Sequence, residues 1–337
     1  MSDALDYRPL GRTGLKVSPL ALGTMSFGRE ADESVSKAMY NRCREVGINV
    51  FDCADVYAKG RSEVILGKLI ASERDEVVLA TKAYFPTGRD PNARGSSRYH
   101  LVRAVEASLT RLDTDRIELF YLHRFDDETA LDETLRALED LVRDGKILYP
   151  AASNFAAWQV MKGLGIQRAA GFSPFVAIQP MYNLVKRQAE VELLPMARSE
   201  GLGVFPYSPL GGGLLAGKYG AQRLPDSGRI VDDPMYAVRY GRDGDLHTAG
   251  AFTALARDRG IHPVSLAVAW VAAHPAVTAP LLGARDLEQL EPALQSLEVP
   301  MDEELHRAVS ALSPEPPPAT DRNEEASAES YSAQLTK

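Results

Sequence analysis

Eight short apolar runs, each followed by a longer amphipathic segment, recur along the chain and limit the folds open to it. The runs are rich in Val, Ile and Leu without strict polar alternation, which is typical of strands buried on both faces. Strands that alternate with helices pair in parallel through right-handed crossovers. Eight such units predict a closed (β/α)8 barrel of the TIM type, with an open doubly wound sheet as the alternative. The runs are 20–22, 48–51, 77–80, 117–122, 147–151, 175–178, 203–205 and 277–282.

The length of 337 residues suits one barrel with additions. We expect residues 1–313 to form a single barrel domain that opens with a β-hairpin over 7–19. A long, Gly-rich and charged segment, 211–247, follows the seventh run and is expected to be a functional loop. Residues 314–337 are proline-rich and then acidic, so we expect a flexible tail there.

The overall charge and the cysteines narrow the class of protein. A formal net charge of −8 argues against bulk attraction to nucleic acid or to an anionic membrane. Cys43 and Cys53 are too few for a disulfide framework or a zinc site, which favours a reducing compartment. Residues 1–10 lack the apolar core of a secretory signal, and the longest apolar stretch, 264–277, is too short to span a bilayer. We therefore expect a soluble cytoplasmic protein without a nucleic-acid or membrane partner, and leave homo-oligomerisation open.

Ionisable side chains follow three successive apolar runs. Asp52, Lys82 and His123 each come just past a run, and Tyr57 lies five residues beyond Asp52. Active sites of barrels form at these carboxyl ends of the strands. Each residue alone has an ordinary interpretation: a helix cap, a surface charge or a core histidine. In one barrel mouth, however, unpaired burial would be costly, so we expect a Lys82–Asp52 pair beside Tyr57 and His123.

The chemistry of such a cluster is proton transfer to a carbonyl oxygen. A phenol has a pKa near 10, and a nearby ammonium is expected to lower it. Tyr57 would then act as general acid, and a neutral His123 would donate a hydrogen bond to the substrate carbonyl. No side chain supplies a hydride, so a nicotinamide is required.

The motifs around these residues resemble those of the aldo-keto reductase family. The resemblance spans about residues 7–313 and implies the barrel, carbonyl reduction and a catalytic tetrad of Asp52, Tyr57, Lys82 and His123. The family binds its dinucleotide without a Rossmann glycine fingerprint, and residues 211–213 do not follow that fingerprint either. The matching segments are 47–63, 79–82, 121–124, 152–155, 207–218 and 282–290.

The same resemblance implies that the cofactor is NADPH/NADP+ and assigns residues to it. Ser153, Asn154 and Gln179, just past the fifth and sixth runs, would bind the nicotinamide carboxamide. Tyr207 would stack on the nicotinamide ring, and the 208–214 backbone with Lys218 would hold the pyrophosphate. Arg285 beside a 2′-phosphate would favour NADPH over NADH. The implied cofactor residues are Gly23, Thr24, Met25, Asp52, Ser153, Asn154, Gln179, Tyr207, Ser208, Pro209, Leu210, Gly212, Leu214, Lys218, Gly283, Arg285 and Gln289. The expected substrate residues are Met25, Phe27, Tyr57, Tyr84, His123, Arg124 and Tyr182, with walls from Phe85, Met181 and the 220–240 segment.

A few positions depart from the family pattern. Ala293 stands where an Asn is common, which puts one adenine hydrogen bond in doubt. Pro150 and Pro206 fall in predicted strands, where a missing N–H would break a ladder bond, so we expect a bulge or a strand end at each. Cys53 replaces the commoner Thr and is interpreted as a small buried side chain.

The sequence thus predicts NADPH-dependent reduction of an aldehyde or ketone to an alcohol, with a small carbonyl compound as substrate. The alternatives are a cofactor-sensing regulatory subunit on the same fold, or a reductase of nucleotide- or phosphate-linked keto-sugars. Metal hydrolysis is disfavoured and no metal is expected, because only His123 among the histidines stands at a strand end. A nucleophilic hydrolase is disfavoured because no Gly-x-Ser-x-Gly elbow occurs. Arg124 would either bind an anionic group of the substrate or, as we expect, pair with Asp126 or Asp127.

Overall fold

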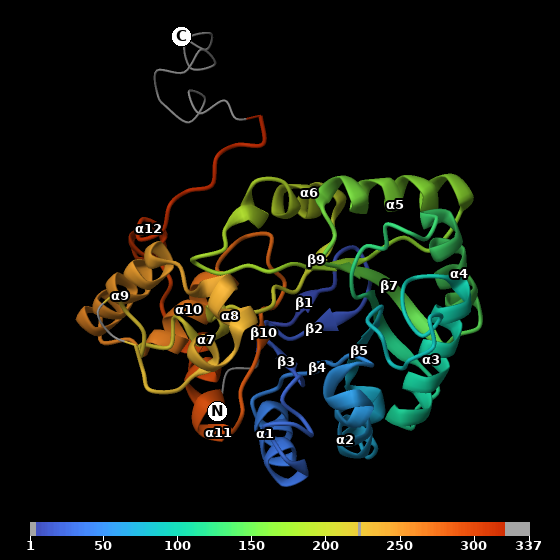
Figure 1. The fold of residues 1–337 in the computed structure, drawn as a ribbon, viewed down its shortest axis with the longest axis horizontal. Coiled ribbons are helices and arrows are strands. Elements are labelled where there is room, and N and C mark those ends of the chain that lie inside the picture. The colour runs from blue at the N-terminus through green and yellow to red at the C-terminus, as the bar shows by residue number, and fades with distance from the viewer. Residues whose placement is uncertain (1–4, 222–223, 321–337) are drawn as a thin grey trace.

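A parallel sheet of eight strands forms the centre of the computed structural model, which describes residues 5–221 and 224–320 (Figure 1). The strand order is β10-β3-β4-β5-β6-β7-β8-β9, so that strands consecutive in the chain are neighbours in the sheet. The strands are β3 (Ala21–Gly23), β4 (Val50–Asp52), β5 (Val78–Ala83), β6 (Ile117–Leu122), β7 (Ile147–Ser153), β8 (Ala177–Gln179), β9 (Gly203–Val204) and β10 (Leu281–Leu282).

The two outer strands of this order are joined by backbone hydrogen bonds. The N–H of Thr278 donates to the carbonyl of Val204 (2.9 Å), and the N–H of Leu281 donates to the carbonyl of Pro206 (2.9 Å). The sheet therefore closes on itself, and the predicted (β/α)8 barrel is confirmed against the open-sheet alternative.

Helices surround the strands on the outside of the barrel (Figure 1). Their apolar faces follow the sequence: in α4, Leu131, Leu135, Leu138 and Leu141 recur at helical spacing and all are buried. Side-chain caps fix the N-termini of several helices. At the start of α3, for example, the Ser97 hydroxyl accepts the N–H of His100 (3.3 Å). The surrounding helices are α1 (Glu33–Glu45), α2 (Arg61–Ile70), α3 (Arg98–Leu112), α4 (Leu131–Arg143), α5 (Ala157–Ala170), α6 (Leu193–Glu200), α10 (Pro263–Ala272), α11 (Leu287–Leu294) and α12 (Glu303–Ser310).

The predicted N-terminal hairpin is present and contributes to the core inside the barrel. Its strands β1 (Arg8–Pro9) and β2 (Lys16–Val17) pair antiparallel. Leu10 and Val17 are fully buried in the cluster that the inward-facing strand residues form. A Cβ on Gly203 of β9 would lie 2.7 Å from Leu10, so the close contact between hairpin and barrel needs a glycine there. The hairpin covers one mouth of the barrel and leaves the other for the site.

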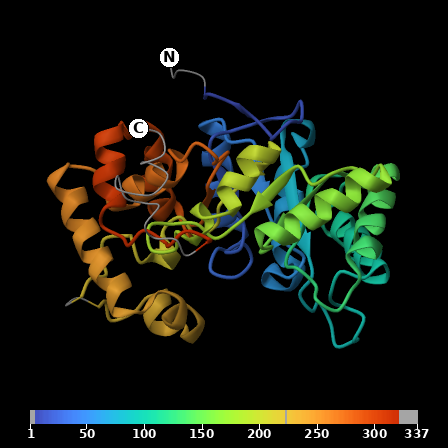
Figure 2. The same cartoon turned by 90° about the horizontal axis from the view of Figure 1, so that it is seen from above.

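The segment 211–247 is more helical than the sequence analysis predicted. It contains α7 (Arg229–Asp232), α8 (Pro234–Tyr240) and the start of α9 (Asp243–Asp258). Asp233 accepts the N–H of Met235 (2.9 Å) and Pro234 occupies the first turn, which together start α8. In Figure 2 this gold segment lies on the same side of the molecule as the orange and red C-terminal helices.

The two prolines expected to interrupt strands behave differently from each other. Pro206 lies two residues past the end of β9. Pro150, however, lies inside β7 with continuous one-to-one register against β6, so the expected bulge or strand end there is wrong. The Pro150 carbonyl accepts the N–H of Val176 (3.0 Å), and a residue's N–H and C=O face the same neighbouring strand. Because β8 begins only at Ala177, the missing N–H costs no ladder bond.

Two further expectations concern the ends of the chain and membranes. Residues 314–320 carry neither helix nor strand, and the rest of the expected tail, 321–337, lies outside the described residues. Among the helices of the described part, none is long and apolar enough to cross a membrane.

Candidate active site

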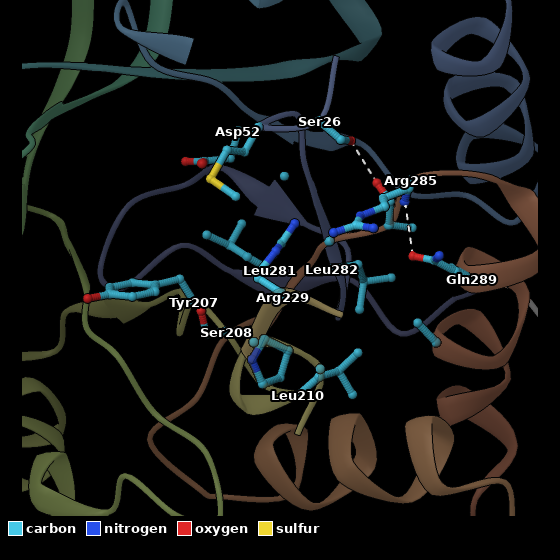
Figure 3. A pocket seen from close by; sticks show the side chains of 18 of the residues that line it. Ser26, Asp52, Tyr207, Ser208, Leu210, Arg229, Leu281, Leu282, Arg285 and Gln289 are labelled. Atoms are coloured by element: carbon cyan, nitrogen blue, oxygen red, sulfur yellow. Dashed lines mark hydrogen bonds between the residues drawn. The ribbon is translucent and has the colours of Figure 1, made fainter. Parts of the chain in front are cut away.

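A cavity of about 880 Å³ opens where the strands end at their carboxyl termini. Figure 3 shows it from close by, with Asp52, Tyr207 and Arg285 among the side chains around it. Its walls include the segments that follow each of the eight strands of the barrel, β3 to β10, which the barrel brings to one mouth. Pockets of this size accommodate cofactors and drug-sized ligands.

A buried ion pair lies at the inner end of this cavity. The Lys82 ammonium is fully buried and contacts Asp52 Oδ1, and it also donates to the carbonyl of Cys53 (2.6 Å). The second Asp52 oxygen accepts the amide of Gln179 (2.8 Å). Burial raises the pKa of Asp52, with Lys82 and Gln179 opposing it. Burial also acts to lower the pKa of Lys82, but Asp52 and Tyr57 outweigh it, so this pKa is raised and the ammonium keeps its proton.

Tyr57 lies beside this pair, with its ring centroid 5.1 Å from Lys82 Nζ. It starts a short turn in which Ala58, Lys59 and Gly60 all have positive φ (48°, 57° and 87°). Such strain at two non-glycine residues persists only where surrounding structure holds it, and it fixes the position of the phenol. Burial raises the pKa of Tyr57 even though Lys82 acts to lower it. The expected net lowering by Lys82 is therefore wrong, because desolvation of the phenolate is the larger effect.

His123 follows β6 and lines the same cavity. Its ring lies 6.0 Å from that of Tyr57 and 4.9 Å from that of Phe85, edge-on to both. Burial, with a further contribution from Lys82, holds the pKa of His123 well below its usual value. The ring is therefore neutral, and its buried Nδ1 has no hydrogen-bond partner within the described residues.

A chain of hydrogen bonds runs from Tyr207 to the ion pair. The Tyr207 hydroxyl donates to Asn154 Oδ1 (2.7 Å), and Asn154 Nδ2 donates to Ser153 Oγ (3.1 Å). Ser153 in turn donates to the carbonyl of Gln179 (3.0 Å), whose side chain binds Asp52. Asn154 also has a positive φ of 56°, a conformation that Asn tolerates better than most residues. The ends of β4, β5, β7 and β8 are thereby joined to the segment after β9.

The opposite end of the cavity is cationic. Lys218, Arg229 and Arg285 line it, and Figure 3 shows Arg229 and Arg285 extending into it from different segments. The turn after β10 is fixed by the N–H of Arg285, which donates to Gln289 Oε1 (3.3 Å), and by Ser26 Oγ, which donates to the carbonyl of Ala284 (2.6 Å). Cations gathered in this way suit phosphate groups.

The residues present fit a dinucleotide in three respects. The cavity has the volume, one end has amide groups and an aromatic side chain, and the other end has the cations. The loop between them is open to close approach: Gly213 and Gly283 have space where a Cβ would lie, and Gly212 has a φ of 66°.

Most, but not all, of the predicted site residues line the cavity. Phe27 and Tyr182 are fully buried in the core, where Tyr182 instead donates to Glu190 (2.7 Å) and packs on Trp270. Tyr84 packs edge-on against Phe85, which takes its place in the wall. The predicted cavity residues that are absent from the wall are Thr24, Phe27, Tyr84, Tyr182 and Leu214, together with Lys82 behind Tyr57 and the expected wall residue Met181.

The sequence analysis did not single out several wall residues. Met235, Tyr236 and Arg239 of α8 line the cavity; they belong to the 220–240 segment, which was expected to contribute to the wall as a loop and not as a helix. The sequence feature that could have identified these three residues is that they are apolar, aromatic and charged within a Gly-rich segment. The further wall residues not named individually are Ser26, Val56, Ala216, Arg229 (within 220–240), His262, Val264, Val268, Leu281, Leu282, Ala284, Glu288 and Pro292.

Comparison with known proteins identifies the family to which this fold belongs. The sequence model of the aldo/keto reductase family matches residues 19–314, and the chain belongs to this family of oxidoreductases. An uncharacterized oxidoreductase of Bacillus subtilis (strain 168) is 38% identical over 328 residues, covering 93% of this chain and 97% of that protein. A probable voltage-gated potassium channel subunit beta of Oryza sativa subsp. japonica is 34% identical over 302 residues (88% and 92%). A versiconal hemiacetal acetate reductase of Aspergillus parasiticus is 31% identical over 326 residues (89% and 94%).

Proposed function

We propose that the protein reduces an aldehyde or ketone to the alcohol with NADPH, and that Tyr57 is the proton donor. The observation that carries the proposal is the buried Lys82–Asp52 pair directly beside Tyr57, at the inner end of a cavity large enough for cofactor and substrate. The reductase names among the relatives point the same way.

The cofactor would lie along the cavity from the amide-rich end to the cationic end. When bound, NADPH supplies the hydride. Ser153, Asn154 and Gln179 would hold the carboxamide end, and the Tyr207 ring would pack on the nicotinamide. Lys218, Arg229 and Arg285 would bind the phosphates, and three cations at that end favour NADPH over NADH.

The proton would come from the Tyr57 hydroxyl to the carbonyl oxygen of the substrate. The raised pKa keeps the phenol protonated at neutral pH, which suits a donor. The Lys82 ammonium stabilises the phenolate left behind, and Asp52 keeps that ammonium charged and in place. Neutral His123 would donate a hydrogen bond that orients the carbonyl.

Replacement of Tyr57 by Phe tests this assignment. We expect turnover of an aldehyde panel to fall by about 10²–10⁴-fold, the usual contribution of a positioned general acid. NADPH affinity, followed by nicotinamide fluorescence, should stay nearly unchanged. Tyr99→Phe, at an exposed position on α3, is the matched control. A fully active Tyr57→Phe enzyme would exclude Tyr57 as the donor.

The potassium-channel subunit names among the relatives favour a second candidate, a cofactor-sensing regulatory subunit. Such a protein would bind NADPH with the same cavity but turn over poorly on every aldehyde or ketone. Tight NADPH binding without turnover across aldehydes, quinones and keto-sugars would favour it. We also propose a cytoplasmic location, with which two free, buried cysteines agree.

A further inference from the structure

Positive charge exceeds negative charge along the cavity wall. Among the described residues, two acidic side chains line it, Asp52 and Glu288, and Asp52 is already neutralised by Lys82. The cationic wall residues are Arg124, Lys218, Arg229, Arg239 and Arg285. The phosphate end accounts for Lys218, Arg229 and Arg285, so Arg124 and Arg239 need another explanation.

Arg124 directly follows His123 and lines the cavity with it. The expected pairing with Asp126 is wrong, because that carboxylate already accepts hydrogen bonds from its own loop and from the segment that precedes α3. It accepts the backbone N–H of Ser96 (2.7 Å) and of Glu128 (3.0 Å), and the hydroxyl of Thr129 (2.7 Å). Neither Asp127 nor another acid within 5–221 and 224–320 forms an ion pair with Arg124.

Arg239 lines the cavity from a segment far from Arg124 in the sequence. It belongs to α8, and its guanidinium packs over the Tyr236 ring at 5.5 Å, a ring that Arg229 also contacts at 5.1 Å. Its charge acts on Tyr207: burial raises the pKa of the Tyr207 hydroxyl to about 12, and Arg239 is the largest opposing influence. Helix α8 also contacts the reaction end directly, because the hydroxyl of Tyr240, the next residue, donates to Met181 Sδ (3.5 Å), and Met181 is bridged to Tyr207. Arg239 too has no ion-pair partner within the described part of the chain.

We propose that the substrate is an anionic carbonyl compound whose carboxylate or phosphate is held between Arg124 and Arg239. The inference rests on the proposed carbonyl reduction and adds its substrate class. A substrate that fills the cavity displaces water from the half-buried Arg239 and from the part of the exposed Arg124 that lines the cavity, and a neutral substrate would leave this loss without compensation. An anionic group replaces that water with charge-assisted hydrogen bonds, for which arginine geometry is suited. It also leaves the carbonyl carbon beside Tyr57 and His123.

A pair of aldehydes that differ only in charge tests the proposal. With NADPH, the wild-type enzyme should reduce para-carboxybenzaldehyde with a kcat/KM at least about 10-fold above that for its methyl ester, since hydrogen bonds to charged groups are the stronger ones. Glyceraldehyde phosphate against glyceraldehyde repeats the comparison for phosphate. The pair with the larger ratio of charged to uncharged kcat/KM shows whether the site prefers a carboxylate or a phosphate.

Two variants locate the effect. Arg124→Gln and Arg239→Gln should each reduce kcat/KM for the charged aldehyde by about 10-fold, mainly through KM, and change the ester value by less than about twofold. Arg242→Gln is the matched control, an exposed arginine between α8 and α9 that does not line the cavity. NADPH affinity should be unchanged in all three variants. A tenfold loss of NADPH affinity in Arg239→Gln would instead assign that residue to the cofactor and overturn the proposal.

A binding measurement separates this inference from the proposed reaction. Calorimetry on the NADP+ complex should show para-(hydroxymethyl)benzoate binding more tightly than its methyl ester, and this preference should be lost in the double variant Arg124→Gln/Arg239→Gln. Equal turnover of both aldehydes with equal binding would refute the anionic substrate and leave the reductase function intact. Absence of any turnover, with the binding preference retained, would refute the reductase function and support the anion site.

Discussion

Replacing Lys82 by Met should destabilise the protein far more than a usual lysine substitution. Lys82 is fully buried, and its removal leaves the Asp52 carboxylate with the Gln179 amide as its one remaining side-chain donor. Removing one partner of a buried ion pair costs about 3–5 kcal/mol because the other charge stays buried without compensation. We expect a loss of that size in the free energy of unfolding at pH 7.

The same substitution should make this loss depend on pH. Burial raises the pKa of Asp52 even with Lys82 present, and without the ammonium that pKa rises further. A carboxyl group whose folded pKa lies above its unfolded value stabilises the fold when protonated, and this stability is lost as the pH rises toward the folded pKa. The penalty of Lys82→Met should therefore be smaller at pH 5 than at pH 8, changing by up to about 1.4 kcal/mol per pH unit.

Urea unfolding of the variants at pH 5 and pH 8 measures both effects. The double variant Asp52→Leu/Lys82→Met removes both charges and should recover much of the lost stability. Lys162→Met, at an exposed position on α5, is the control and should stay within about 0.5 kcal/mol of wild type. A Lys82→Met penalty as small as the control's, or one equal at both pH values, would show that Lys82 does not compensate a buried charge.

Three more predictions test other parts of the site. Arg285→Ala should weaken NADPH binding at least about 10-fold more than NADH binding in fluorescence titrations, and equal losses would place the 2′-phosphate elsewhere. Gly212→Ala should destabilise the protein by about 1–3 kcal/mol more than Gly283→Ala, because a Cβ at 212 lies 2.7 Å from Tyr236 at a φ of 66°, whereas space is open at 283 and φ is not positive there; similar chemical denaturation curves for the two would contradict the clash. Burial raises the pKa of Asp55 from 3.8 to about 7, so the wild type should lose about 2–3 kcal/mol relative to Asp55→Asn between pH 5 and pH 7 and little more above it. Stability curves that run parallel across this range would mean that Asp55 is not desolvated.

The barrel could be predicted because its determinants are local. Each buried strand is a short apolar run, and the residue just past it falls at the mouth whatever the details of packing. This is why Asp52, His123, Asn154 and Gln179 meet as predicted. Phe27 lies in the turn after β3, and nothing in the sequence distinguishes an aromatic residue that faces the cavity from one that faces the core.

The parts that the sequence did not reveal depend on packing between distant segments. Helix α8 is short, and its burial depends on Tyr236 and Tyr240, whose rings are stacked 6.4 Å apart and lie against Gly212. Its place opposite the strand ends is set by this packing, not by its own periodicity. The pKa of Tyr57 was likewise missed because the burial of its ring, which outweighs the charge of Lys82, is a tertiary property.

Because a chain of hydrogen bonds runs from Tyr207 to Asp52, the two ends of the cavity should differ in how well they tolerate substitutions. At the reaction end, a new side chain at Asn154 or Gln179 disturbs residues on four strands, so substitutions there must come in compatible sets. The cations at the other end, Lys218, Arg229 and Arg285, belong to the segment before α7, to α7 and to the turn after β10, outside that chain. Substitutions among these cations can thus change the charge of that end while the hydrogen-bonded chain stays as it is.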